Sequence, residues 1–207
     1  NYVNSVDYKN ILLCPSNFNK DKIKLEFGNN IKSPRNQLNN GLKKGGIYYL
    51  NPKFRPQKTI QAIALKLCQN KAGNYLDNLS SALNQRDFSI NFVEKISLEV
   101  QGNMSEQDVA KIDKELERLI VVNNPDLFLT ILPEGDKQLD DTNQGSYYHY
   151  ISQKLLKQGI PSQMVSVENL NNQYIINNIV LGILAKLGNL PFVLADPLRV
   201  ANVFLGL

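Results

Sequence analysis

The sequence predicts an α/β layered fold in which a mostly parallel central sheet is flanked by helices. From about residue 58 onward, apolar strand-like runs alternate with segments whose apolar residues recur at helical spacing. The run 126–132 (Asp-Leu-Phe-Leu-Thr-Ile-Leu) is almost entirely apolar, which is typical of a parallel strand covered on both faces. Alternation of strand and helix around such strands indicates a Rossmann-like arrangement.

Each element has its own local signal. Strands are expected at 59–67, 88–93, 96–100, 126–132, 162–165, 191–194 and 203–207. Helices are expected at 74–85, after the capping pair Ser105 and Asp108, at 147–158 and at 172–187. Gly159 with Pro161, and Gly188, mark where the last two helices end.

Three segments organise the chain. Residues 1–57 are rich in Asn and Lys and carry short extended pieces at 11–14 and 47–50, so we expect a linker or lead-in rather than an independent domain. Residues 58–194 form the expected α/β domain. We expect residues 195–207 to lie beyond this domain and to begin another one.

Composition excludes several classes of protein. Hydrophobic residues make up 43% and charged residues 20%, as in ordinary globular domains, and no apolar run approaches the length of a membrane helix. Two cysteines and one histidine, His149, argue against cysteine zinc sites and most histidine-based catalysis. The net charge of +4 is compatible with nucleic-acid binding. We expect a cytoplasmic protein without a signal peptide or a membrane partner; the absent initial Met suggests a trimmed or partial chain.

The loop 133–146 is the first place to expect an anion site. It leaves the carboxyl end of the most apolar strand and enters a helix, and helix N-termini in parallel α/β sheets present free N–H groups to anions. Next along the chain, Tyr150 and Lys154 are spaced i, i+4 and share a helix face. Such a pair suits a base stacked above its own phosphate, although tyrosines on a helix are more often half-buried core residues.

Two further polar residues complete the candidate site. Gln163 stands at the edge of a strand, where its amide can donate to a phosphate oxygen; taken alone, it is better explained as a surface residue. Lys186 lies near the end of a helix, where a lysine also complements the helix dipole.

Together these residues resemble the MID domain of the Argonaute and Piwi family, in its prokaryotic form. The stretches that carry the resemblance are Tyr150-Ile-Ser-Gln-Lys154, Gly159-Ile-Pro-Ser-Gln163 and the run from Asn178 to Lys186-Leu-Gly188. The resemblance implies that Lys154, Lys186 and Gln163 hold the 5′ phosphate of a guide strand. It also implies that Tyr150, or alternatively Tyr147, stacks on the first base, and that Asn178 supports the pocket.

The resemblance implies further properties. Many prokaryotic members bind a divalent cation such as Mg²⁺ between the glutamine and the guide phosphates, here at Gln163. The loop 133–146 would sense the first base. Residues 195–207 resemble the approach to the first strand of the PIWI domain, so the remaining Argonaute domains, or a subunit carrying PIWI, are expected partners. The chain ends before the family's slicing aspartate, and we expect no enzyme activity from it alone.

Two departures from the family pattern stand out. The closing Gly-Gly of the family is Gly188-Asn189 here, and Gly182 stands where some relatives carry another basic residue. The leading hypothesis is a module that anchors the 5′-phosphorylated end of a DNA or RNA guide strand. The alternatives are a phosphate-binding α/β enzyme or group-transfer domain for a small nucleotide ligand, and a scaffold that docks a partner chain.

Overall fold

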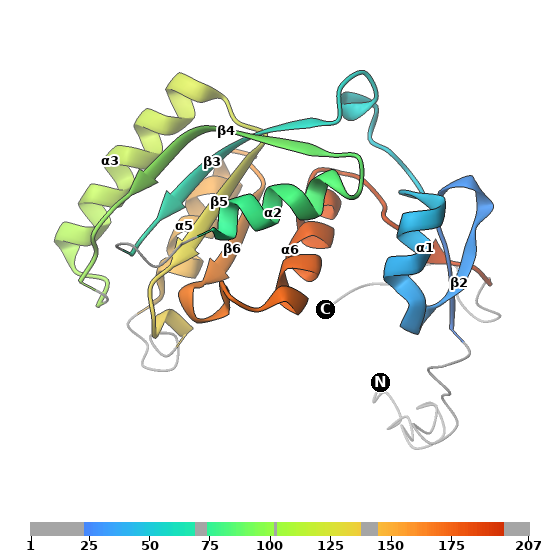
Figure 1. Cartoon of the computed structure of the whole chain (residues 1–207). Helices are drawn as coiled ribbons and strands as arrows, with labels where there is room; N and C mark the ends of the chain where they lie inside the picture. Colours follow the sequence, from blue (N-terminus) through green and yellow to red (C-terminus); the bar gives the residue numbers. More distant parts are fainter. Residues whose placement is uncertain (1–22, 69–73, 102, 138–144, 197–207) are drawn as a thin grey trace, which may run out of the picture. The chain divides into compact units, whose positions relative to one another are not determined.

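The computed structural model describes residues 23–68, 74–101, 103–137 and 145–196, which form two compact units (Figure 1). One unit combines the described residues up to and including Tyr48 with those from Phe192 onward, and the other runs from Tyr49 to Pro191. The boundary therefore falls nine residues before the expected start at 58. Every candidate site residue belongs to the larger unit.

The smaller unit is more ordered than a lead-in. Strands β1 (Lys24–Glu26), β2 (Lys32–Pro34) and β7 (Val193–Leu194) form an antiparallel sheet in the order β2-β1-β7, with helix α1 (Leu38–Gly45) beside it. Phe27 is buried in this unit, and Gly41 is required there because a Cβ would lie 2.2 Å from its ring. The strand expected at 191–194 thus exists but joins this sheet rather than the parallel one. The segments 11–14 and 203–207 lie outside the described residues, as does most of 195–207.

The larger unit contains the expected parallel sheet. Its strands lie in the order β4-β3-β5-β6, and every neighbouring pair is parallel. The bounds are β3 (Thr59–Lys66), β4 (Ser89–Ser97), β5 (Leu127–Leu132) and β6 (Ser162–Ser166). All six residues of β5 are buried, as its apolar run indicated. The two strands expected at 88–93 and 96–100 are one strand, because the polar residues between them stay in register after a shift opposite Ala62 and Ile63.

Helices cover both faces of this sheet (Figure 1). Helices α2 (Tyr75–Asn84) and α6 (Gln173–Lys186) pack together on one face, and α3 (Glu106–Asn123) and α5 (Tyr147–Lys157) cover the other. The core beneath α3 and α5 consists of apolar side chains from both helices and the sheet, among them Ile63, Leu65, Ile112, Leu116, Phe128, Ile151 and Leu155. Short 3-10 turns at Gly28–Asn30, Arg35–Gln37, Pro52–Phe54 and Val167–Asn169 complete the described chain.

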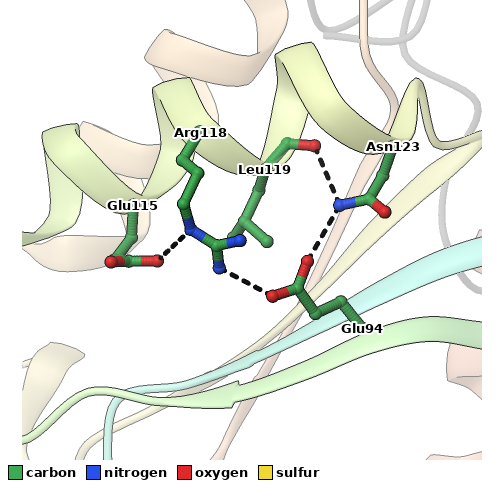
Figure 2. A network of polar contacts seen from close by, with 5 residues as sticks. All are labelled: Glu94, Glu115, Arg118, Leu119 and Asn123. Atoms are coloured by element: carbon green, nitrogen blue, oxygen red, sulfur yellow. Dashed lines mark hydrogen bonds and ion pairs between the residues drawn. The ribbon is translucent and has the colours of Figure 1, made fainter.

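A polar network joins α3 to the outer strand β4 (Figure 2). Arg118 donates to Glu94 at 2.7 Å and to Glu115 at 3.0 Å, and Asn123 donates to the other Glu94 oxygen at 2.9 Å. These hydrogen bonds from Arg118 and Asn123 hold the pKa of the Glu94 carboxyl below its ordinary value. Because the network is open to solvent, it orients α3 on the sheet more than it stabilises the fold.

A buried carboxylate fixes α5 against the start of α3. Ser105 caps α3 by accepting from the Asp108 N–H, and Asp108 accepts from the Gln101 N–H at 2.9 Å and from the Tyr147 hydroxyl at 2.8 Å. The same hydroxyl accepts from the Met104 N–H at 3.2 Å. Burial raises the pKa of Asp108, but its hydrogen bonds outweigh burial and leave the pKa below its ordinary value. Tyr147 therefore has a structural role.

We predict that Tyr147→Phe lowers the free energy of unfolding by about 1–3 kcal/mol, because the Met104 N–H and the Asp108 carboxylate each lose a buried partner. The carboxylate part of this loss is present above the unfolded pKa of Asp108 and disappears as the pH falls through its lower folded pKa. Urea unfolding at several pH values measures this difference in the free energy of unfolding between parent and variant. Equal stabilities of variant and parent at neutral pH would contradict this role.

Candidate functional site

Lys186 and Gln163 meet at the outer edge of the parallel sheet. The Lys186 ammonium, in the last turn of α6, donates to the Ser162 carbonyl at 2.5 Å and to Gln163 Oε1 at 3.1 Å. The Gln163 amide nitrogen donates to the Met164 carbonyl at 3.0 Å. Burial of the ammonium lowers the pKa of Lys186. Because an ammonium carries three N–H groups, this one can still donate to a ligand oxygen.

Two features of α6 position this pair. Asn178, Gly182 and Lys186 share one helix face, and a Cβ at Gly182 would lie 3.0 Å from Gln163 Oε1. Glycine therefore leaves room for the Gln163 amide, and this explains the departure from the family pattern at position 182. Asn178 is exposed on this face, and its expected supporting role stays a prediction.

The departure at Gly188-Asn189 also has a structural explanation. Gly188 ends α6 at φ 78°, and a Cβ there would lie 2.8 Å from Asn51 Nδ2. Asn189 is fully buried, donates to the Leu184 carbonyl at 3.1 Å and accepts from the Asn51 N–H at 3.0 Å. Asparagine thus ties the end of α6 to the segment before β3, close to Lys186.

Tyr150 and Lys154 share a helix face, as expected, but they contact α3 rather than the Gln163–Lys186 pair. The Tyr150 hydroxyl donates to Asp113 of α3 at 2.8 Å, and the Lys154 ammonium donates to the same carboxylate at 3.0 Å. The Lys154 ammonium also lies 5.3 Å from the centre of the Tyr150 ring. Asp113 and Tyr150 raise the pKa of Lys154. The sequence-predicted site therefore divides into a Gln163–Lys186 pair and a separate Asp113–Tyr150–Lys154 cluster.

The alternative stacking residue, Tyr147, is not placed to stack on a ligand either. Its side chain is fully buried, and its hydroxyl bonds to Asp108 in the core between α3 and α5. A ring in that position cannot stack on a ligand base without leaving the core.

Two other residues of α5 face open space. Tyr148, 44% exposed, lines a cavity of about 320 Å³ with Leu132, Asp136, Lys137, His149, Met164 and Ser166. Ser152, one turn later, lines a second cavity of about 360 Å³, whose other lining residues are Leu156, Gly159, Ile160, Pro161, Ser162 and Lys186. Both cavities border β6, and together we call them the α5–β6 groove. Sequence reasoning missed this pair because 148 and 152 have the same i, i+4 spacing as 150 and 154.

The expected anion site at the N-terminus of α5 is filled by the protein itself. The Asp136 carboxylate accepts from the Tyr147 N–H at 2.9 Å and from the Tyr148 N–H at 3.2 Å. Ser146 accepts from the His149 N–H at 3.3 Å. These amides are thus already bonded, and the buried carboxylate adds negative charge where a phosphate was expected. The expectation of free helix amides for an anion is wrong here.

The described residues do not fit a divalent cation at Gln163. Its amide oxygen faces the Lys186 ammonium at 3.1 Å, and a cation on the same oxygen would lie beside that positive charge. Within the described part of the chain, no group of three His, Cys, Asp or Glu side chains could hold a metal ion.

The sequence is similar to one curated protein in particular. It is 29% identical over 126 residues to the Argonaute protein of Aquifex aeolicus, covering 57% of this chain and 18% of that protein. No protein-family model matches the chain.

Known structures agree on the fold. The crystal structure of Aquifex aeolicus Argonaute superposes with a TM-score of 0.62 at 18% identity, over 84% of this chain and 23% of the other. Kluyveromyces polysporus Argonaute with a guide RNA superposes with a TM-score of 0.59 at 15% identity, over 84% and 22%. The C-terminal lobe of a budding yeast Argonaute superposes with a TM-score of 0.57 at 14% identity, over 84% and 37%.

The chain is therefore similar to Argonaute proteins in sequence and in fold. It spans about a fifth of the length of the Aquifex relative. No helix among the described residues is both long and apolar enough to cross a membrane.

We predict that Gly182→Ala weakens the contact between Gln163 and Lys186 without unfolding the chain. Alanine favours the helix by up to about 1 kcal/mol, which offsets the cost of moving the flexible Gln163 amide, so the stability changes by less than about 1 kcal/mol. The displaced amide loses its hydrogen bond with the Lys186 ammonium, which the Ser162 carbonyl then holds alone. Thermal unfolding measures the stability, and a crystal structure of the variant shows the position of the amide; an amide that keeps its hydrogen bond to Lys186 would contradict the prediction.

Proposed function

We propose that this chain is a guide-strand-binding module that anchors the 5′-phosphorylated end of a DNA or RNA guide in the α5–β6 groove. The observation that carries the proposal is the Lys186 ammonium, held by Gln163 and the Ser162 carbonyl at the outer edge of β6, in the cavity that Ser152 also lines. A charged donor at the rim of an open cavity suits a terminal phosphate.

In this proposal, different residues of the groove bind the phosphate and the first base. Lys186 and Gln163 bind the terminal phosphate, which adds affinity without reading sequence. The exposed Tyr148 ring stacks on the first base, a contact worth roughly 1–3 kcal/mol that tolerates any base. Tyr148 takes this role in place of Tyr150, whose hydroxyl is engaged with Asp113. The cavity beside Tyr148 offers polar groups on Asp136, Lys137, His149 and Ser166 to the edge of that base.

The comparisons support this proposal. The chain aligns with an Argonaute protein in sequence, and one structure with the same fold contains a guide RNA. In the proposal this chain binds rather than catalyses, and the parts of an Argonaute protein that it does not span supply target recognition and any cleavage. The role also implies a cytoplasmic location.

Binding of single-stranded oligonucleotides tests the proposal. We predict that Lys186→Ala lowers affinity for a 5′-phosphorylated strand about ten-fold and affinity for the 5′-hydroxyl strand far less, because one charge-assisted hydrogen bond is lost. Lys154→Ala is the matched control, since its ammonium is paired with Asp113, and it leaves the ratio of the two affinities unchanged. Fluorescence anisotropy with DNA and RNA of one sequence measures both.

Three results would contradict the proposal. The first is an equal loss of affinity for both strands in Lys186→Ala. The second is a loss of phosphate preference in Lys154→Ala alone. The third is competition by a free nucleotide that is as strong as competition by a whole strand. The last result would favour the enzyme interpretation.

The pH dependence follows from the pKa of Lys186. Burial lowers this pKa, so the ammonium loses its proton at a lower pH than an ordinary lysine does. Preference for the 5′-phosphorylated strand is therefore complete near neutral pH and declines as the pH rises through the lowered pKa. Lys186→Arg, which stays charged, keeps its preference over that range. Identical pH profiles for the parent and the arginine variant would exclude Lys186 as the phosphate ligand.

A further inference from the structure

The cavity that Ser152 and Lys186 line contains fewer positive charges than a doubly charged phosphate calls for. A terminal phosphate carries a charge near −2 at neutral pH. Lys186 is the one lysine or arginine among the described residues that line the cavity of Ser152. This cavity thus compensates about half of the ligand charge by direct contact.

Among the described residues, neighbouring charges do not make up the difference. Lys137 lines the other cavity of the groove, together with the carboxylate of Asp136. Lys154 is held by Asp113, outside the groove. Lys53, which shares a third cavity with Lys186, is paired with Asp126. The N-terminus of α5 is occupied by the Asp136 carboxylate, so its dipole is already compensated.

Ser152 occupies the position at which a second positive side chain could enter the cavity of Lys186. It lies one turn after Tyr148 on the groove side of α5, and it lines the same cavity as Lys186 from the opposite helix. A longer basic side chain at 152 would extend into that cavity toward the Lys186 ammonium. Serine offers a short neutral hydroxyl instead.

We propose that residue 152 sets the terminal-group specificity of the groove, and that Ser152 makes the site weakly selective between a 5′-phosphate and a 5′-hydroxyl end. This inference rests on the proposed function. With one ammonium, the parent protein prefers the phosphorylated strand by about ten-fold or less, and the stacked base carries much of the affinity. A second ammonium at 152 would make the site strictly phosphate-dependent.

The experiment compares the parent chain with Ser152→Lys and Gln153→Lys. Gln153 is exposed on the same helix, lines neither cavity of the groove, and provides a matched change of charge. Affinities for 5′-phosphorylated and 5′-hydroxyl strands of one sequence are measured by anisotropy over a range of salt concentrations. Circular dichroism and thermal unfolding confirm that each variant is folded.

Ser152→Lys should raise the phosphate-to-hydroxyl preference by about a further ten-fold. For the phosphorylated strand alone, it should also steepen the slope of log K against log salt concentration by about 0.7. Gln153→Lys should raise both affinities equally. The inference is overturned if Ser152→Lys leaves the preference unchanged, if Gln153→Lys raises it as much, or if the parent already prefers phosphate by a hundred-fold or more.

These outcomes differ from a failure of the proposed function. That failure appears as a parent protein that binds neither strand, or as Lys186→Ala without effect on the preference. A parent whose preference depends on Lys186, together with a Ser152→Lys variant that does not increase it, refutes the role of residue 152 alone.

Discussion

The rotation of α5 about its own axis is the constraint on which the candidate site depends. A stripe of buried side chains, Tyr147, Ile151 and Leu155, faces the core shared with α3 and the sheet. The hydrogen bond from Tyr147 to the buried Asp108 adds a directional contact to this apolar packing. With that stripe in place, residues on its two sides point to different surroundings. Tyr148 and Ser152 then border the α5–β6 groove, and Tyr150 and Lys154 meet Asp113.

The orientation of α5 also determines which charges near the groove are compensated by neighbouring carboxylates. Two carboxylates compensate positive charge on α5. Asp136 accepts from the first amides of α5, and Asp113 neutralises Lys154. Lys186 remains at the sheet edge, where partial burial lowers its pKa and brings its ammonium into contact with the Gln163 amide. The groove is therefore electrostatically modest, which gives weight to the apolar and aromatic surface along α5.

Much of the fold could be predicted from the sequence because its signals are local. The apolar run of β5, the capping pair at Ser105 and Asp108, and the helix-ending Gly188 each act within a few residues. The strand break expected between 93 and 96 was wrong because Glu94 is polar in sequence but bonded to Arg118 across the sheet surface. The partner of β7 was also missed, since strand pairing depends on segments more than a hundred residues apart.

The sequence by itself determined the parallel α/β class, the positions of its helices, and the resemblance that directs attention to Gln163 and Lys186. It also contained the i, i+4 spacing of aromatic and polar residues along α5, but that spacing fits two pairs equally well. Only the tertiary structure decided between them, because the choice depends on which stripe of the helix is buried against strands distant in the chain. It also decided that the amides at the start of α5 are taken, since Asp136 reaches them from across a loop that no local pattern describes.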